Sequence, residues 1–183
     1  GLTVIPDGAD LQMNKSKSPA LVAVFAGGDY RDSRMVSALR VYNVGPRAVT
    51  SNLQVVDVLD AGEQWINEST GAPFGPGSSV RIGAWSCSVN RAWALGQPQT
   101  VTCTLVDGYP VAAGTNAPSL SLATLARAPG QLTNQACTGG SGGSSEPGTA
   151  GGIDRDPNDS NNCVGAGARA TDERAGLSIT KQT

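Results

Sequence analysis

The chain has 183 residues, of which only 4% are aromatic and 15% are charged, and its formal net charge is -2. This charge offers no basic surface for nucleic acid, and no run of 18 or more apolar residues provides a membrane span. The chain contains no histidine, which excludes Ser-His-Asp and Cys-His catalytic arrangements. Its few carboxylates are mostly isolated, so we expect a protein that is not an enzyme.

Segments in which apolar residues alternate with polar ones follow one another along the chain. The first is 9–15, and the runs 34–44 and 53–59, joined by the turn Gly45-Pro46, are interpreted as two strands of a meander. The remaining predicted strands are 80–89, 100–106, 117–125, 132–137 and 164–170. Glycine and proline turns separate these short strands, a pattern that predicts an all-β, immunoglobulin-like antiparallel sandwich.

The segment 138–162 is rich in glycine and serine and has almost nothing that could be buried. Alone it would be a flexible linker, but a cysteine flanks it on each side. We therefore expect a long surface loop inside one domain. The predicted organisation is an N-terminal extension over residues 1–8, a β-sandwich module over 9–174, and, over 175–183, either the first strand of the next repeat or a strand that links subunits.

The four cysteines, Cys87, Cys103, Cys137 and Cys163, form no CxxC pair, which disfavours a zinc site. Cys87 and Cys103 lie in neighbouring predicted strands, and Cys137 and Cys163 flank the Gly/Ser-rich loop. We predict these two disulfides, with free buried thiols as the alternative. Disulfides imply an oxidising compartment outside the cytoplasm, so we expect an extracellular or cell-surface protein.

The two ends of the chain carry the same strand pattern, 166 residues apart. Leu177, Ile179 and Lys181 occupy positions equivalent to Leu11, Met13 and Lys15. Such a duplication is typical of a repeat whose last segment is the first strand of the next unit. The expected partners are therefore neighbouring copies of the chain, joined covalently in tandem or by strand exchange between subunits.

The order of the motifs resembles that of the DUF11 repeat, a bacterial surface-protein module. The resemblance begins with residues 9–15 and continues with Asn43-Val44-Gly45-Pro46 and with 48–59 (AVTSNLQVVDVL). Asp60-Ala61-Gly62 departs from the Pro-x-Gly that is usual in the family. Later matches are Cys87, 101–105, Leu132, Asn134, Ala136, Asp154, Asp156, Pro157, Asn161 and Asn162. The resemblance implies an immunoglobulin-like repeat in bacterial stalks, fibres or adhesins, without catalytic activity.

Asp154, Asp156 and Asn158 place oxygen ligands at alternating positions, as calcium loops do. No glutamate follows at the twelfth position, which is Gly165, and Pro157 stiffens the spacing. We favour Asp and Asn side chains that cap a turn, with Ca²⁺ as the alternative and no other cofactor.

A second candidate site is an intramolecular isopeptide bond. Lys15 would supply the amine, Asn134 or Asn162 the acyl group, and Asp57 the assisting acid, because desolvation makes a lysine amine nucleophilic. The alternative is that Lys15 is a surface charge that protects a sheet edge.

The three tryptophans, Trp65, Trp85 and Trp93, offer a different possibility, a platform on which sugars stack. Packing in the core is the default for a tryptophan near a disulfide, here Trp85. From the sequence we thus expect a structural repeat module of a bacterial extracellular fibre or adhesin stalk. The alternative is an adhesive module that binds a glycan, a protein or a surface.

Overall fold

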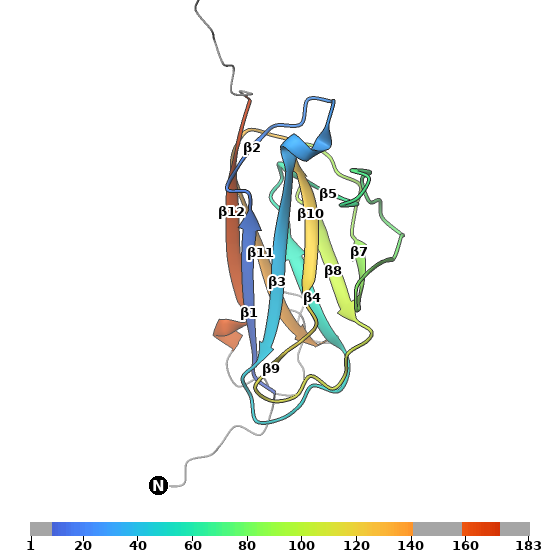
Figure 1. The fold of residues 1–183 in the computed structure, drawn as a ribbon, viewed down its shortest axis with the longest axis vertical. Helices are drawn as coiled ribbons and strands as arrows, with labels where there is room; N and C mark the ends of the chain where they lie inside the picture. Colours follow the sequence, from blue (N-terminus) through green and yellow to red (C-terminus); the bar gives the residue numbers. More distant parts are fainter. Residues whose placement is uncertain (1–8, 141–158, 173–183) are drawn as a thin grey trace, which may run out of the picture.

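The computed structural model describes residues 9–140 and 159–172, which form a two-layer β-sandwich (Figure 1). The first sheet has the strand order β1-β3-β10-β5, with β9 paired to β3. Its strands are β1 (Leu11–Ser18), β3 (Arg34–Asn43), β5 (Glu63–Ile66), β9 (Thr115–Asn116) and β10 (Leu120–Ala126).

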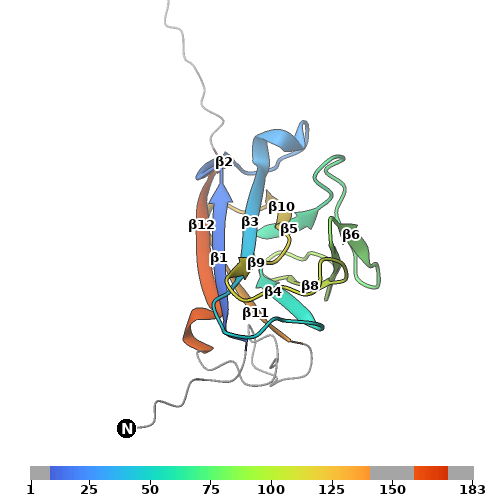
Figure 2. The ribbon, with the colours of Figure 1, turned by 60° about the horizontal axis from the view of Figure 1, so that its bottom comes forward.

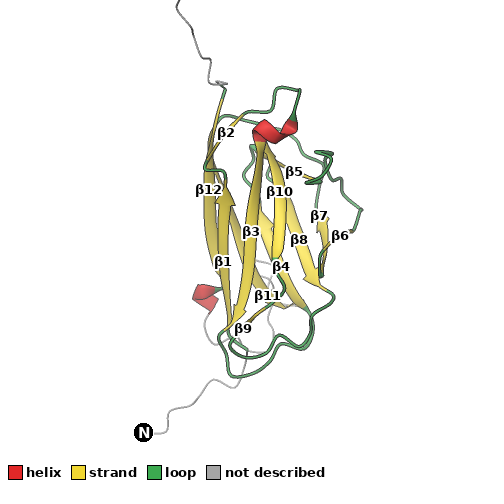
Figure 3. Cartoon of the chain, viewed as in Figure 1, coloured by secondary structure: helices red, strands yellow, loops and turns green. Residues whose placement is uncertain are grey.

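The second sheet has the order β2-β12-β11-β4-β8-β7-β6. Its strands are β2 (Leu21–Ala23), β4 (Leu53–Val58), β6 (Val80–Ile82), β7 (Trp85–Val89), β8 (Thr100–Leu105), β11 (Gly130–Gly140) and β12 (Cys163–Thr171). Only the short pair β2–β12 is parallel among the described ladders. Two 3-10 turns, η1 (Tyr30–Ser33) and η2 (Asp159–Asn161), complete the described elements (Figure 3). The all-β, immunoglobulin-like antiparallel sandwich predicted from the sequence is confirmed.

Alternation of apolar residues explains why these segments form strands. In β3 every second residue from Met35 to Asn43 is buried, and the residues between them face outward. In β4 the buried positions are Leu53, Val55 and Asp57. This period of two directs one face of each strand into the space between the sheets.

Two sequence predictions about the connections are wrong. The runs 34–44 and 53–59 are not neighbours in a meander, because β3 and β4 belong to different sheets. The side-chain Nδ2 of Asn43 donates hydrogen bonds to the Arg47 and Val111 carbonyls, and its Oδ1 accepts one from the Gly45 backbone amide. These bonds fix the turn through which the chain passes from the first sheet to the second. The run 80–89 is a hairpin rather than one strand, because Gly83 has a φ of 57° in a two-residue turn between β6 and β7.

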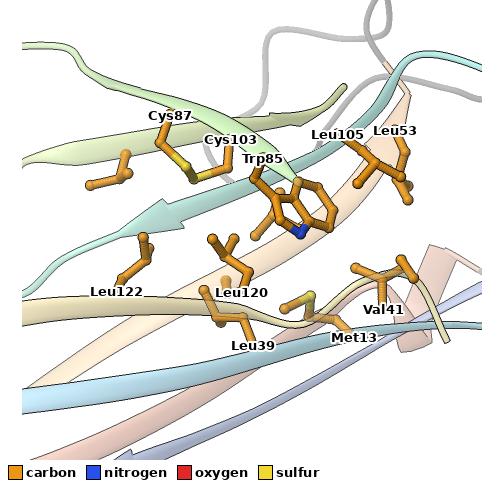
Figure 4. Packing of buried hydrophobic residues seen from close by; sticks show 14 of the residues in the cluster. Met13, Leu39, Val41, Leu53, Trp85, Cys87, Cys103, Leu105, Leu120 and Leu122 are labelled. Atoms are coloured by element: carbon orange, nitrogen blue, oxygen red, sulfur yellow. A yellow bond between two sulfur atoms is a disulfide. The ribbon is translucent and has the colours of Figure 1, made fainter. Parts of the chain in front are cut away.

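The main apolar core fills the space between the two sheets (Figure 4). Trp85 and the Cys87–Cys103 disulfide of the second sheet point toward Leu39 and Leu120 of the first sheet. Each of these large side chains is almost completely buried, which stabilises the fold by about 2 kcal/mol per side chain. A second apolar cluster consists of Val22, Met35, Ala126, Leu132, Ala168 and Ala170.

The chain enters the sandwich at one end and leaves it at the other. The Asn161 Nδ2 donates a hydrogen bond to Asp10 Oδ1 at 2.9 Å, so β12 begins beside the start of β1. At the far end, the Val24 amide donates to the Thr171 carbonyl at 2.9 Å. The strands β1 and β12 lie side by side along one edge of the sandwich and run toward the same end (Figures 1 and 2). Residues 9 and 172 therefore lie at opposite ends.

Candidate functional site

A layer of polar side chains crosses the sandwich between the main apolar core and the second apolar cluster. In β3 the buried Ser37 lies between Met35 and Leu39, and in β10 the buried Thr124 lies between Leu122 and Ala126. In β11 the buried Asn134 interrupts the inward row in the same way, between Leu132 and Ala136. Lys15 and Lys17 follow Leu11 and Met13 on the inward face of β1. We call this set, together with Asp57 and Glu63, the polar layer.

The first contact in the polar layer joins the two sheets. Lys15 Nζ, from β1, lies 2.5 Å from Asp57 Oδ1, from β4, and both side chains are completely shielded from solvent. Burial lowers the pKa of the Lys15 amine, although the charge of Asp57 opposes this shift. Burial also raises the pKa of the Asp57 carboxyl against the opposing effect of Lys15. Both shifts favour the neutral amine and the neutral acid.

The second contact pairs Lys17 with Glu63, and these side chains are also completely buried. The Thr124 hydroxyl donates to Glu63 Oε2 at 3.1 Å, and Asn134 Nδ2 lies 3.5 Å from the same oxygen. The first distance is that of an ordinary hydrogen bond, and the second is at the outer limit. Burial raises the pKa of the Glu63 carboxyl, with Lys17 acting in the opposite direction.

Three buried polar atoms of this layer have no hydrogen-bond partner within the described part of the chain. They are Ser37 Oγ, Asp57 Oδ2 and Asn134 Oδ1. Leaving such an atom unpaired in a protein interior costs roughly 1–3 kcal/mol, and such atoms are rare in native structures. Three of the seven such atoms among the described residues therefore belong to this one layer.

Asp57 and Asn134 are neighbours on the inner face of the second sheet. The register of β4 and β11 places Asp57 opposite Ala136, so Asn134 is its diagonal neighbour two residues along the strand. Diagonal neighbours on one face are separated by about 7–8 Å between Cα atoms, within reach of side chains of this length. Lys15, Asp57 and Asn134, the three residues that the sequence singles out for an isopeptide bond, therefore belong to one buried cluster.

Other sequence interpretations of these residues are resolved by the structure. The view of Lys15 as a surface charge is wrong, because its side chain is fully buried. Asn162 follows η2 beside Asn161, which bonds Asp10 at the start of β1. Lys15 is five residues further along β1, roughly 16 Å away at the usual rise of a strand. Asn162 is therefore not the partner of Lys15.

Lys17, Glu63 and Thr124 were not predicted as site residues from the sequence. A signal for Lys17 exists, since the period of two that places Lys15 on the face of Leu11 and Met13 places Lys17 there as well. Glu63 has no comparable signal, because it opens a four-residue strand, β5, that was not predicted.

Both predicted disulfides are confirmed. Cys87 lies opposite Cys103 in the β7–β8 ladder, and Cys137 lies opposite Cys163 in the β11–β12 ladder. For loops of this size the chain-entropy account gives about 3 kcal/mol of stabilisation each. Both bonds lie within the second sheet, so neither connects the first sheet to it.

Several expected site residues lie outside the described residues. They are the calcium candidates Asp154, Asp156 and Asn158, and the inter-module residues Leu177, Ile179 and Lys181. Across residues 9–140 and 159–172, no group of three or more Cys, Asp or Glu side chains could hold a metal ion. Leu11 and Met13, the equivalents of Leu177 and Ile179, are buried core residues. The described residues include no helix long and apolar enough to cross a membrane.

The three tryptophans do not form a common platform for sugars. Trp65 and Trp85 are each only 1% exposed, and Trp85 Nε1 donates to the Pro118 carbonyl at 2.9 Å. Trp93 is half-buried, with the Arg127 guanidinium 4.8 Å from its ring centroid. Trp65 is thus a residue of the main apolar core, with its ring centroid 4.2 Å from that of Phe74.

Comparisons with known proteins find likeness of shape but not of sequence. No model of a known protein family matches the chain, and no curated protein matches it. Among solved structures, the CARDB domain of a Pyrococcus furiosus protein, in complex with di-metal ions, covers 93% of this chain and 95% of its own, with a TM-score of 0.45 and 13% identity.

Two further solved structures have similar TM-scores and sequence identities. A cohesin module from a Clostridium perfringens family 33 glycoside hydrolase has a TM-score of 0.46 at 8% identity, covering 91% of this chain and 98% of its own. A collagen-binding domain from a Staphylococcus aureus adhesin has a TM-score of 0.41 at 10% identity, covering 92% and 99%. All three resemble this chain in fold alone, at 8–13% sequence identity.

Proposed function

We propose that this chain is a structural repeat module of a bacterial extracellular or cell-surface protein, one unit of a stalk or fibre. The observation that carries the proposal is the course of the chain, which enters at the Asp10 end of the sandwich and leaves at the Thr171 end. A module whose two connections lie at opposite ends extends a filament when it is repeated, whereas a module with adjacent ends folds back on its neighbour.

Two further features support this role. The strand pattern of residues 9–15 recurs at 175–181, as expected where one unit passes into the next. The two disulfides suit a protein that stays folded in an oxidising environment. The DUF11-like order of motifs agrees with the same role. We favour this role over an adhesive binding module, because two of the three tryptophans that could form a sugar platform are core residues.

A chain of two units tests the proposal. Residues 9–174 are followed directly by a second copy of 9–183, so that the second copy of 9–15 replaces 175–181. Small-angle X-ray scattering then compares the maximum dimension with that of the single chain. We expect an increase on the order of 30 Å, the length of a ten-residue strand such as β3. A two-unit chain no longer than the single chain, or one with an unfolded second copy, would refute the proposal.

The single chain tests whether the link can also form between subunits. Removing residues 175–183 deletes the segment that would donate the strand. If subunits exchange strands, the full chain forms filaments in electron micrographs and the truncated chain does not. If the units are joined only covalently, neither forms filaments, and the scattering result stands alone.

A further inference from the structure

We propose that Lys15 and Asn134 become joined by an amide bond between Lys15 Nζ and Asn134 Cγ, with Asp57 as the proton carrier. The bond would connect β1 of the first sheet to β11 of the second. The inference stands on the buried side chains of the polar layer and does not require that the module be part of a stalk.

The geometry provides the three groups that such a reaction needs. Lys15 Nζ is in contact with Asp57 Oδ1 at 2.5 Å, with both side chains excluded from water. Asn134 is 1% exposed and lies diagonally beside Asp57 on the same inner face, and its Nδ2 lies 3.5 Å from Glu63 Oε2, on the carboxylate that Lys17 contacts. Asp57 Oδ2 and Asn134 Oδ1 both lack a hydrogen-bond partner among the described residues. Asp57 Oδ2 is therefore available to carry a proton, and Asn134 Oδ1 to accept the negative charge that develops when the carbonyl is attacked.

The alternative of a bond between Lys15 and Asp57 themselves fits the contacts less well. Such a bond needs a second acid to carry the proton to the departing water. The nearest candidate is Glu63, which is already engaged by Lys17 and Thr124. That bond would also leave the Asn134 carbonyl buried without a role or a partner.

The reaction requires no oxidant and no cofactor. A proton passes from the Lys15 ammonium to the Asp57 carboxylate, and the lone pair of the neutral amine attacks Asn134 Cγ. The carbonyl electron pair moves onto Oδ1. As it returns, the bond from Cγ to Nδ2 breaks, and Asp57 carries a proton from Nζ to Nδ2. The products are the secondary amide and ammonia, and Asp57 ends with the proton that it first received.

The surroundings favour the reactive protonation states. Because burial lowers the pKa of Lys15 and raises the pKa of Asp57, the amine is more readily neutral and the carboxyl more readily protonated than in water. The apolar clusters on both sides of the polar layer exclude water that would compete as a nucleophile.

If the chain is a stalk module, the bond also completes a covalent route through it. This point rests on the proposed function. The route would run from β1 through Lys15 to Asn134 on β11, then through the Cys137–Cys163 disulfide to β12, where the chain leaves. Force applied at the two ends would then be carried by these covalent bonds and not by the residues between Lys15 and Asn134.

Mass spectrometry of the full chain tests the bond directly. After reduction of both disulfides under denaturing conditions, we expect an intact mass about 17 Da below that of the sequence, the mass of one ammonia. Succinimide formation at an asparagine also removes ammonia, so the linkage must be located. Trypsin does not cleave after an acylated lysine, and the expected product is residues 1–17 joined to residues 128–155.

Variants then assign the roles. Lys15→Arg and Asp57→Asn keep the size of each side chain, and we expect both to have the full sequence mass. The matched variant Lys17→Arg, on the same face of β1, should keep the loss of about 17 Da. Residues 16–31 joined to residues 128–155 in the wild type would instead place the bond on Lys17, which contacts the same Glu63 as Asn134, and would contradict the assignment to Lys15.

The wild-type protein alone can overturn the proposal, even where a variant fails to fold. An unchanged mass would mean an ion pair only, and a loss of about 18 Da would mean a bond to a carboxyl instead of Asn134. Either result would leave the scattering experiment on two units unaffected, so the two proposals can fail separately.

Discussion

At the scale of single residues, the polar layer holds two lysine–carboxylate contacts where apolar side chains would pack. Moving such charges out of water costs several kcal/mol per ion, and their attraction offsets this only when the geometry is favourable. The Lys17–Glu63 contact has further support from the Thr124 hydroxyl, whereas Asp57 keeps an unpartnered oxygen. Removing one partner of a pair should therefore lower the stability of the fold strongly, whereas replacing both partners with apolar residues should lower it much less.

Loss of the Glu63 carboxylate is predicted to destabilise the fold. We expect Glu63→Ala to lower the free energy of unfolding by about 3–5 kcal/mol, because it leaves the Lys17 charge buried and unpaired. The double variant Lys17→Met/Glu63→Leu removes both charges and should recover most of this loss. Urea denaturation monitored by tryptophan fluorescence measures both. Asp107→Ala breaks the exposed Arg81–Asp107 pair and serves as the control with little effect. A double variant as unstable as Glu63→Ala would contradict the explanation.

The raised pKa of Glu63 predicts an unusual pH dependence of the free energy of unfolding. The pKa of Glu63 is raised in the folded state, so the folded chain binds more protons than the unfolded chain above the unfolded pKa of 4.5. The contribution of Glu63 to stability is then greatest below that pH and is lost as the pH rises through the folded pKa. We expect the stability of the wild type relative to Glu63→Gln to increase as the pH is lowered from 7 toward 4.5, in urea titrations of both proteins. A difference that decreases toward acid would contradict the assignment.

At the scale of elements, the strands that the sequence predicts well are the long ones with one buried face. The β3, β4, β8 and β12 segments show a regular alternation that depends only on neighbours along the chain. The strands β2 and β5 were not predicted, because three or four residues are too few to show a period. Their pairing is decided by the sheets that receive them, β12 for β2 and β10 for β5.

Contacts between elements explain what the sequence could and could not indicate about the site. Lys15, Asp57 and Asn134 were identified because each is a polar residue within a predicted strand. The contact of Lys17 with Glu63 joins β1 and β5, the first and last strands of the β1-β3-β10-β5 path. No pattern along the sequence specifies which side chains of such separate strands meet inside a sandwich. The incorrect prediction of a meander has the same origin, because the residues of a turn do not determine which sheet the following strand joins.

At the scale of the whole molecule, the positions of the covalent bonds decide how the module resists extension. Both disulfides lie in the second sheet, and the chain enters through β1 at the edge of the first. Without the Lys15–Asn134 bond, no covalent cross-link joins β1 to the second sheet, and apart from the backbone only non-covalent contacts hold β1 in place among the described residues. With it, force applied at the two ends passes through Lys15, Asn134, Cys137 and Cys163, and the intervening strands carry no load.

Single-molecule pulling on the two-unit chain distinguishes these cases. We expect the oxidised wild type to show almost no gain in length on unfolding between Lys15 and Cys163. Reduction should release only the Cys137–Cys163 loop, whose sequence separation of 26 corresponds to about 90 Å of extended chain. In oxidised Lys15→Arg, unfolding frees the roughly 100 residues between Lys15 and Asn134 that lie outside the Cys87–Cys103 loop, on the order of 350 Å per unit. Gains of that size in the wild type would show that the load passes through the strands, because a covalent link between β1 and β11 leaves no slack for them to extend.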